Sequence, residues 1–274
     1  MTNGGRTKAL LRRLLRFVPT PGWTRRYPHL NRLESCKKRA LCHLLLRESG
    51  NMVFSGPFAT MKLRNNLTLA SDPKYIIGCY EQEVHAVIND VICSAPGNII
   101  DIGSAFGYYA VGLALKTASS EIIAFEEVEE PHWRELCELA MLNGVSTRVT
   151  QLGLCTVTEL KRACREGSFI LCDCEGGEED LLDPCAVPLL KTCKILTELH
   201  EFHRPNLVGT LVTRFKGSHN IRLIEGSERN PSAIRILKKL PRRWRSVAME
   251  EPKWVGDTPP RTSTWLRFML LTPK

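Results

Sequence analysis

Two stretches of the sequence end in side chains that can accept or donate a proton. In "ILCDCEGGE" the alternation of a strand places Asp173 and Glu175 on one face, and in "KILTELHEF" it places Glu198 and His200 on one face. If the stretches form neighbouring strands, these four side chains meet at one rim of a sheet. Such a group suits removal of a proton from a hydroxyl, with His200 as general base and Glu198 or Asp173 orienting its imidazole. His203, just past the second stretch, is the second candidate for the base.

Other roles are open for the same residues. His200 is equally consistent with a structural histidine that is held by hydrogen bonds. The four groups also suit a divalent cation such as magnesium or manganese, although a site without metal is favoured. Glu178, Glu179 and Asp180 fall in the first turn of the next expected helix, where the helix dipole favours acids. For those three a structural role is expected.

A glycine-rich turn follows an apolar run in "NIIDIGSAFGYYAVGLAL", residues 98–115. A dinucleotide fingerprint that starts at Gly103 needs glycine at positions 105 and 108, which hold Ala105 and Tyr108. A phosphate-binding Walker loop is excluded as well, because no Gly-Lys-Ser/Thr follows. The turn therefore favours a cofactor that has no pyrophosphate.

The spacing of Asp101, Gly103 and Gly107 suits S-adenosylmethionine. Gly103 lets the backbone approach the amino-acid portion of that cofactor, and Asp101 faces its ammonium group directly or through water. An acid should close the next strand to accept both ribose hydroxyls, and "EIIAFEE" supplies Glu126. A helix-capping Asp101 and a solvated Glu126 are the alternatives. The other residues expected at the cofactor are Tyr80, Glu81, Ser104, Tyr108, Glu127 and Asp173.

Strands that alternate with helices are expected to position these residues. The strands are predicted at residues 98–102, 121–127, 148–152, 168–176, 194–202, 220–226 and 263–273, and the main helices at 108–116, 131–144, 157–167 and 206–217. This alternation predicts an α/β fold with a doubly wound, mostly parallel sheet. Residues 52–63 are predicted to form two short strands around a turn. We expect a basic helical extension over residues 1–50 and one domain over residues 51–274.

Positive charge is concentrated near the N-terminus. The chain has 38 Lys and Arg against 29 Asp and Glu, and eleven of those cations but only one acid lie in residues 1–42. The remainder is close to neutral, so a nucleic-acid partner is not expected. "KALLRRLLRFVP" is typical of a basic amphipathic helix that packs on its own protein, contacts an anionic membrane peripherally, or forms part of a transit peptide. Cations with Trp244 in residues 225–264 indicate contact with an anionic or sugar-bearing acceptor, or a solvated basic helix.

The eleven cysteines include no C-x-x-C pair, so the sequence indicates no zinc site. A reducing, cytoplasmic setting fits this usage best, with peripheral membrane contact through the basic helix as an addition. No stretch has the roughly 18 uninterrupted apolar residues of a membrane-spanning helix.

Four stretches together resemble the successive motifs of FkbM-type class I S-adenosylmethionine-dependent methyltransferases. They are "IIDIGSAFGYYAVGLAL", "AFEEVEEPHWRELCELAMLNGV", "ILCDCEGGEEDLLDP" and "ILTELHEF", within about residues 75–202. Glu127 departs from the pattern, since that family usually has proline there. The resemblance implies a Rossmann-like sheet with an antiparallel last strand. It also implies methyl transfer, commonly to a hydroxyl of a sugar, a polyketide or a lipid-linked glycan.

We therefore expect O-methylation of a sugar, a glycolipid or a small metabolite. One alternative is a nucleic-acid methyltransferase or RNA-binding protein that uses the basic leader. It lacks the Asn/Asp-Pro-Pro-aromatic strand end that is typical of amino methylation of bases, because the corresponding stretch ends in Asp173-Cys174-Glu175-Gly176. Another is a methyltransferase-like partner protein without catalytic activity.

Overall fold

The computed structural model describes residues 28–127, 130–201, 203–226, 234–240, 244–245, 248 and 266–274. The chain forms two compact units, one made of Met1–Tyr80 with Arg229–Glu251 and the other of Glu81–Glu228 with Pro252–Lys274. A boundary after residue 50 is expected from the sequence, whereas residues 51–80 group with the first unit. The amphipathic helix expected at residues 8–19 lies outside the described residues.

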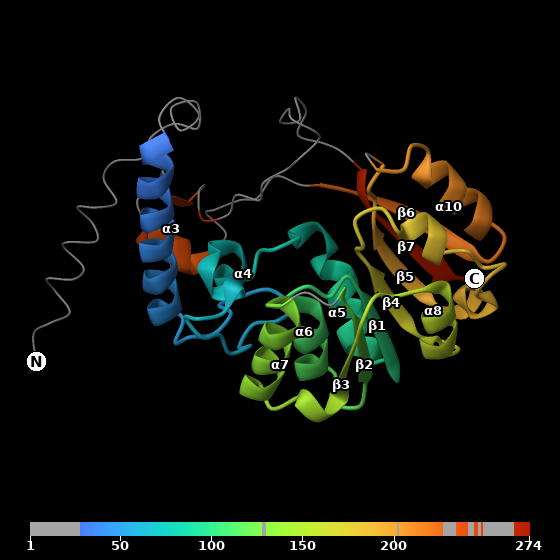
Figure 1. Cartoon of the computed structure of the whole chain (residues 1–274), viewed down its shortest axis with the longest axis horizontal. Coiled ribbons are helices and arrows are strands. Elements are labelled where there is room, and N and C mark those ends of the chain that lie inside the picture. The colour runs from blue at the N-terminus through green and yellow to red at the C-terminus, as the bar shows by residue number, and fades with distance from the viewer. Residues whose placement is uncertain are drawn as a thin grey trace, which may run out of the picture. The chain divides into compact units, whose positions relative to one another are not determined.

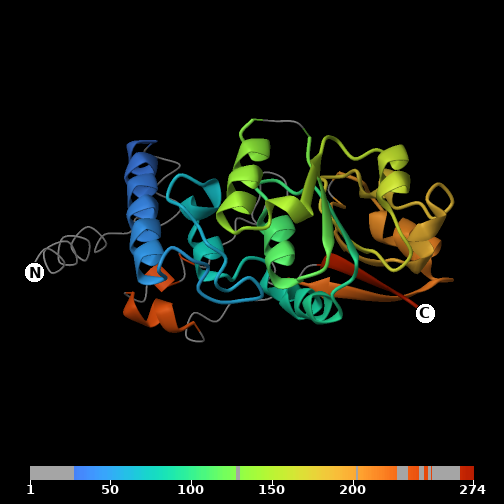
Figure 2. The same ribbon diagram turned by 90° about the horizontal axis from the view of Figure 1, so that it is seen from below.

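The second unit is built on a sheet whose seven strands, within the described residues, follow the order β3-β2-β1-β4-β5-β7-β6. β1 to β5 are parallel, and β7 runs antiparallel to both β5 and β6. Figure 2 shows β7, in red, beside β6, in orange. The strands are β1 (Asn98–Ile102), β2 (Glu121–Phe125), β3 (Val149–Leu152), β4 (Phe169–Cys172), β5 (Lys194–Glu198), β6 (His219–Glu225) and β7 (Leu266–Pro273). This is the Rossmann-like, mostly parallel sheet with an antiparallel last strand that the sequence predicts.

Helices cover both faces of this sheet, with α6 and α7 on one side and α8 and α10 on the other (Figure 1). Ile100 and Ile102 of β1 pack in one buried cluster with Leu160 of α8 and Leu211 of α10. The helices of the second unit are α5 (His85–Ser94), α6 (Tyr108–Lys116), α7 (His132–Leu142), α8 (Val157–Ala163), α9 (Glu178–Leu181) and α10 (Leu207–Phe215), with 3-10 helices η2 (Gln82–Val84), η3 (Ser146–Arg148) and η4 (Pro188–Thr192).

β1 is the strand that positions the site. All five of its residues are buried, as expected for a central strand between two helical layers. At its start, the Asn98 side-chain amide donates to Ser168 Oγ at 2.8 Å and to the Ala163 carbonyl at 3.0 Å. At its end, Gly103 adopts a left-handed conformation with φ +83°. The chain leaves the sheet at this glycine and enters the turn that precedes α6.

β4 and β5 are shorter than the sequence predicts. β4 ends at Cys172 rather than at residue 176, and β5 ends at Glu198 rather than at residue 202. Glu175 and Gly176 have φ values of +52° and +107°, which an extended strand does not contain. Asp173 and His200 therefore lie in loops at the strand ends, not within strands.

The first unit is assembled around α3 (Pro28–Glu48), which contacts α4 (Pro73–Ile77) and the 3-10 helix η1 (Thr68–Ser71). Leu41 and Leu45 of α3 are buried, and Lys38 forms an ion pair with Asp72 at 2.8 Å. Residues 51–80 belong to this unit because α4 and η1 pack on α3.

Two predictions for the first unit are wrong. Residues 52–63 form one antiparallel bridge between Met52 and Lys62 instead of two strands, because Thr60 is left-handed at φ +76° and interrupts the extended chain. Trp244 is only 2% exposed, and Leu237 of the 3-10 helix η6 (Arg235–Lys239) is also buried. This tryptophan contributes to a core and is not available to an acceptor. Within the described part of the chain, no helix combines the length and apolarity needed to span a bilayer.

Candidate active site

A cavity of about 540 Å³ lies at the carboxyl ends of β1 to β4. Parallel α/β sheets bind their ligands at this edge, and small-molecule sites typically have volumes of roughly 300–1,000 Å³. Four segments line it, namely the turn after β1, the end of β2, the loop after β3 and the loop after β4. They contribute Gly103, Ala105, Glu126, Glu127, Cys155 and Asp173, among others.

Glu126 presents its carboxylate to this cavity from the end of β2. Its Oε2 accepts a hydrogen bond from the Ala105 N–H at 2.7 Å, and its Oε1 lies 3.4 Å from His132 Nδ1. The His132 ring packs edge-on against Phe106, with the ring centroids 4.3 Å apart. The carboxylate is thereby held in place, and it keeps lone pairs for the hydroxyl groups of a ligand. Glu127 beside it also lines the cavity and is exposed.

The first three N–H groups of the turn after β1 donate hydrogen bonds to the last residue of β2 and to the residue that follows it. The N–H groups of Gly103 and Ser104 donate to the Phe125 carbonyl at 2.9 and 3.0 Å. With the bond from Ala105 to Glu126, three successive N–H groups fix the turn against the β2 end. The cavity wall at this point is therefore set before any ligand binds.

Both glycines of the turn allow a close approach by neighbouring segments. A Cβ atom on Gly103 would lie 1.7 Å from the Asp173 carbonyl oxygen, and one on Gly107 would lie 2.8 Å from Leu136 Cγ. Gly107 is also left-handed, at φ +83°. The loop after β4 thus packs directly on the turn after β1, which brings Asp173 to the cavity.

Asp101 is buried in β1, and it accepts a hydrogen bond from the Ala110 N–H in the first turn of α6. This contact is the helix-capping alternative that the sequence left open. Burial raises the pKa of Asp101 to about 7; the Ala110 N–H opposes this rise and the Glu126 carboxylate adds to it. Its Oδ2 has no hydrogen-bond partner among the described residues. A cofactor role for Asp101 stays a prediction.

The other residues expected at the cofactor are divided between the two units. Ser104 and Tyr108 are buried in the second unit, as is Glu81, whose carboxylate accepts a hydrogen bond from Tyr109 Oη at 2.5 Å. Tyr80 belongs to the first unit. The cofactor contacts of all four expected residues stay predictions.

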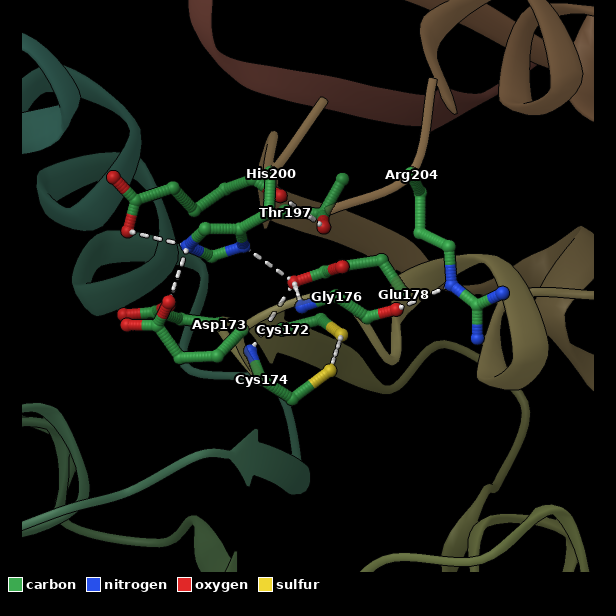
Figure 3. Close-up of polar contacts among 10 residues, drawn as sticks. Cys172, Asp173, Cys174, Gly176, Glu178, Thr197, His200 and Arg204 are labelled. Carbon is green, nitrogen blue, oxygen red and sulfur yellow. Dashed lines mark hydrogen bonds and ion pairs between the residues drawn. The ribbon is translucent and has the colours of Figure 1, made fainter. Parts of the chain in front are cut away.

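The loops after β4 and β5 form a second group of charged residues, the His200 cluster, defined as His200 with Asp173, Glu175, Glu178 and Glu198. His200 Nδ1 lies 2.6 Å from Glu178 Oε1. His200 Nε2 lies 3.5 Å from Glu175 Oε2, 3.7 Å from Asp173 Oδ1 and 3.9 Å from Glu198 Oε2. Figure 3 shows the imidazole ring between Glu178 and Asp173. The structure thus brings together all three residues that the sequence predicts to be catalytic.

Glu178 is the member of this cluster to which the sequence assigns only a structural role. Its carboxylate is completely buried, and Oε1 accepts hydrogen bonds from the N–H groups of Cys174 and Gly176 as well as the contact with His200. Burial acts to raise the pKa of Glu178, but these hydrogen bonds and the His200 charge lower it below its ordinary value. The sequence signal was its place in the stretch "ILCDCEGGEEDLLDP", one of the four that resemble FkbM-type motifs. The helix dipole explains little here, because α9 has only four residues.

Asp173 and Glu198 follow residues that pair directly across β4 and β5, Cys172 and Thr197. Burial raises the pKa of Asp173 well above its ordinary value, and the charges of Glu198, Glu81 and Glu175 raise it further. Carboxylate oxygens of Glu81, Asp173 and Glu198 lie within 4.8 Å of one another.

His200 lies among these negative charges, with its Nε2 at 3.5–3.9 Å from three carboxylate oxygens. Burial acts to lower the pKa of His200, but the hydrogen bond to Glu178 and the surrounding carboxylates raise it above its ordinary value. Donor atoms of Asp173, Glu175 and His200 also lie within 4.8 Å of one another, which is close enough to share a divalent cation. A cluster without metal stays the prediction.

His203, the second candidate for the base, is exposed, and its ring centroid lies 6.3 Å from that of His200. The next residue, Arg204, anchors this loop, because its Nε donates to the Gly176 carbonyl at 3.1 Å and its Nη2 pairs with Asp180 at 2.8 Å.

No protein-family model matches the chain, and a search of curated proteins finds no match. Solved structures that match include an O-methyltransferase from Bacillus cereus in complex with SAH, at 14% identity over 68% of this chain and 78% of that chain, with a TM-score of 0.42. The SAH-bound methyltransferase PaMTH1 of Podospora anserina matches at 16% identity over 70% and 78%, also with a TM-score of 0.42. An rRNA methylase from Streptococcus thermophilus matches at 10% identity over 70% and 96%, with a TM-score of 0.41.

Proposed function

We propose that this protein is an S-adenosylmethionine-dependent methyltransferase that methylates a hydroxyl of a sugar, a glycolipid or a small metabolite. The observation that carries the proposal is the cavity at the ends of β1 to β4, where Ala105 holds the Glu126 carboxylate at the end of β2. A carboxylate in this place accepts two ribose hydroxyls at once. The resemblance of four motifs to FkbM-type enzymes supports the same assignment.

The residues around the cavity fit this cofactor. Glu126 and Glu127 would hold the sugar, and the turn after β1 with the buried, unpartnered Oδ2 of Asp101 would hold the amino-acid portion. The acidic side chains after β4 suit a ligand that carries a positive sulfonium. When bound, S-adenosylmethionine supplies a methyl group whose bond to sulfur breaks, with its electron pair left on sulfur, as the acceptor oxygen bonds to that carbon.

The chain's own residues then have two tasks. They must hold the acceptor hydroxyl in line with the methyl group, and they must take its proton. Asp173 lines the cavity, while His200 and Glu198 stand next to it with side-chain exposures of 15% and 19%. We therefore place the acceptor hydroxyl on the side of the cavity formed by the loop after β4, where Asp173 lies near His200 and Glu198.

Calorimetric titration of the full-length protein with S-adenosylhomocysteine tests the cofactor. The wild type should bind, and Glu126→Gln should bind about 10-fold to 100-fold more weakly, because charge-assisted hydrogen bonds to the ribose contribute about 1.5–3 kcal/mol. Glu121→Gln is the matched control, since Glu121 is an exposed acid at the opposite end of the same strand. Absence of binding by the wild type at millimolar ligand would refute the proposal.

Incubation of the protein with methyl-labelled S-adenosylmethionine and a cell extract tests the acceptor class. Label should enter the glycan, glycolipid or small-molecule fraction as an ether, which survives alkaline hydrolysis. Label confined to RNA or DNA would instead support a nucleic-acid methyltransferase.

A further inference from the structure

We infer that the proton of the acceptor hydroxyl passes to the carboxyl pair of Asp173 and Glu198, and that Glu178 is a positioning residue that keeps His200 beside this pair as its cationic partner. This inference rests on the proposed function, which supplies the acceptor. It changes the role predicted for His200, which here stabilises the base and does not itself act as the base.

The first step of the argument concerns the Nδ1 side of His200. Glu178 Oε1 lies 2.6 Å from Nδ1 and also accepts the N–H groups of Cys174 and Gly176. Two backbone N–H groups favour the ionised form of this buried carboxylate, and only a hydrogen on Nδ1 makes its 2.6 Å contact with an ionised oxygen attractive. The same contacts fix the orientation of the ring.

The second step concerns the Nε2 side. This nitrogen faces oxygens of Asp173, Glu175 and Glu198 at 3.5–3.9 Å. A nitrogen lone pair directed at carboxylate oxygens would be repelled by them, whereas an N–H group is attracted. Both ring nitrogens are therefore protonated, and an imidazolium has no lone pair with which to accept a proton.

The third step identifies the group that can accept it. Asp173 lines the cavity, and a Glu198 carboxylate oxygen from the adjacent strand end lies within 4.8 Å of its carboxylate. Two carboxylates this close bind one proton tightly, because like charges at such distances resist joint ionisation, and the His200 charge stabilises the ionised pair until the acceptor supplies that proton. The raised pKa of Asp173 supports this role, since a carboxylate with a higher pKa is a stronger base.

The proton balance is then complete. As the acceptor oxygen forms its bond to the methyl carbon, its hydrogen leaves as a proton to the ionised carboxylate pair, which then holds it between the two groups. The side chains of Asp173 and Glu198 are 29% and 19% exposed, so the pair can return the proton to water after the reaction. The charged groups that face His200 are Glu178 from α9, Asp173 and Glu175 from the loop after β4, and Glu198 from β5, with the ring of His203 nearby.

Nitrogen-15 NMR of the histidine side chains tests the charge of His200 without any acceptor. The chain has seven histidines, and His200→Gln identifies the signal of interest by its loss. At pH 7 both His200 nitrogens of the full-length wild type should show protonated shifts. Glu178→Gln should lower the pKa of His200 by about one unit or more, whereas Glu179→Gln, its neighbour in sequence, should leave it in place. A neutral His200 in the wild type at pH 7 would overturn the inference, even if Glu178→Gln failed to fold.

Methyl transfer in the labelled-extract assay tests the identity of the base. Asp173→Asn and Glu198→Gln should each lower turnover by about 100-fold or more. Calorimetry with S-adenosylhomocysteine should still detect binding by Glu198→Gln, because Glu198 is not among the residues expected at the cofactor. His200→Gln should remain active but reach half of its maximal rate about one pH unit higher, because the pair has lost its cationic partner.

Two results would contradict these assignments. One is loss of turnover by His200→Gln at every pH while S-adenosylhomocysteine still binds, which would make His200 the base. The other is micromolar binding of Mn²⁺ to the wild type that disappears in Glu198→Gln, which would make the cluster a metal site. Failure of the wild type to bind S-adenosylhomocysteine would count against the proposed function. The NMR measurement would still decide the charge of His200, because it needs neither cofactor nor acceptor.

Discussion

Replacement of Asp101 by asparagine should change how the stability of this protein depends on pH. The carboxyl is buried in β1, and its pKa is raised from 3.8 to about 7, mainly by burial. The folded state therefore binds this proton more tightly than the unfolded state does. The stability that protonated Asp101 contributes is complete below pH 3.8 and is lost as the pH rises through about 7. Asp101→Asn removes the ionisation and keeps an oxygen that can accept the Ala110 N–H.

The size of the effect follows from the two pKa values. A rise from 3.8 to about 7 corresponds to about 4 kcal/mol in total, at about 1.4 kcal/mol per unit. Part of this loss has already occurred at pH 5, where the unfolded carboxyl is ionised and the folded one is not. Between pH 5 and pH 8 the expected loss in the free energy of unfolding is about 2.6 kcal/mol.

Urea titrations of the full-length chain at pH 5 and pH 8 measure this loss. Relative to the wild type, Asp101→Asn should gain about 2.6 kcal/mol in the free energy of unfolding on going from pH 5 to pH 8. Asp90→Asn, which alters an exposed acid on α5, should follow the wild type at both pH values. If Asp101→Asn and the wild type changed equally with pH, the buried carboxyl would not titrate in this range and the reasoning would fail.

Two further substitutions test packing at the ends of β1. Gly103→Ala should lower the free energy of unfolding by more than about 2 kcal/mol, because its Cβ would overlap the Asp173 carbonyl. Gly144→Ala is the control, because it has a similar positive φ but lies in open space, and it should lower the free energy of unfolding by only about 1 kcal/mol. Denaturant titration that found equal losses would exclude the overlap as the cause. Asn98→Ala should cost about 1–3 kcal/mol, because the Ala163 carbonyl loses this donor and the buried Ser168 hydroxyl is left with the Arg165 N–H as its donor. A loss below about 0.5 kcal/mol would contradict this.

The sheet was predictable because its signals are local. β1 was predicted at residues 98–102 and is found there, since an apolar run between Pro96-Gly97 and Gly103 has few other conformations available. α7 likewise lies within the predicted range 131–144 and ends at Leu142, because Asn143-Gly144 is a local stop signal. The prediction of two short strands over residues 52–63 is wrong for the opposite reason. Their conformation depends on a left-handed threonine, Thr60, which no local preference indicates.

The candidate site was predictable only in part. Strand ends that lie side by side bring Asp173 and Glu198 together, and this follows from the order of the parallel strands. The contact between Glu178 and His200 joins residues 22 positions apart across two loops. It requires the positive φ values of Glu175 and Gly176, which turn the chain so that Glu178 faces the loop after β5. A pattern of residue types along the sequence does not contain that turn.

The charge of His200 could not be predicted from the sequence for a further reason. A histidine next to carboxylates in a sequence is a natural candidate for a general base, because one acid that contacts it orients the ring and leaves one nitrogen free. Here acids contact both nitrogens, Glu178 on one side and Asp173, Glu175 and Glu198 on the other. The second set of contacts changes the chemistry, because it holds the proton that a base would have to lack. The presence of a carboxylate beside a histidine therefore does not decide its role, but the number of carboxylates does. A histidine with a carboxylate at one nitrogen can accept a proton at the other. A histidine with carboxylates at both nitrogens instead stabilises a neighbouring carboxylate that accepts the proton.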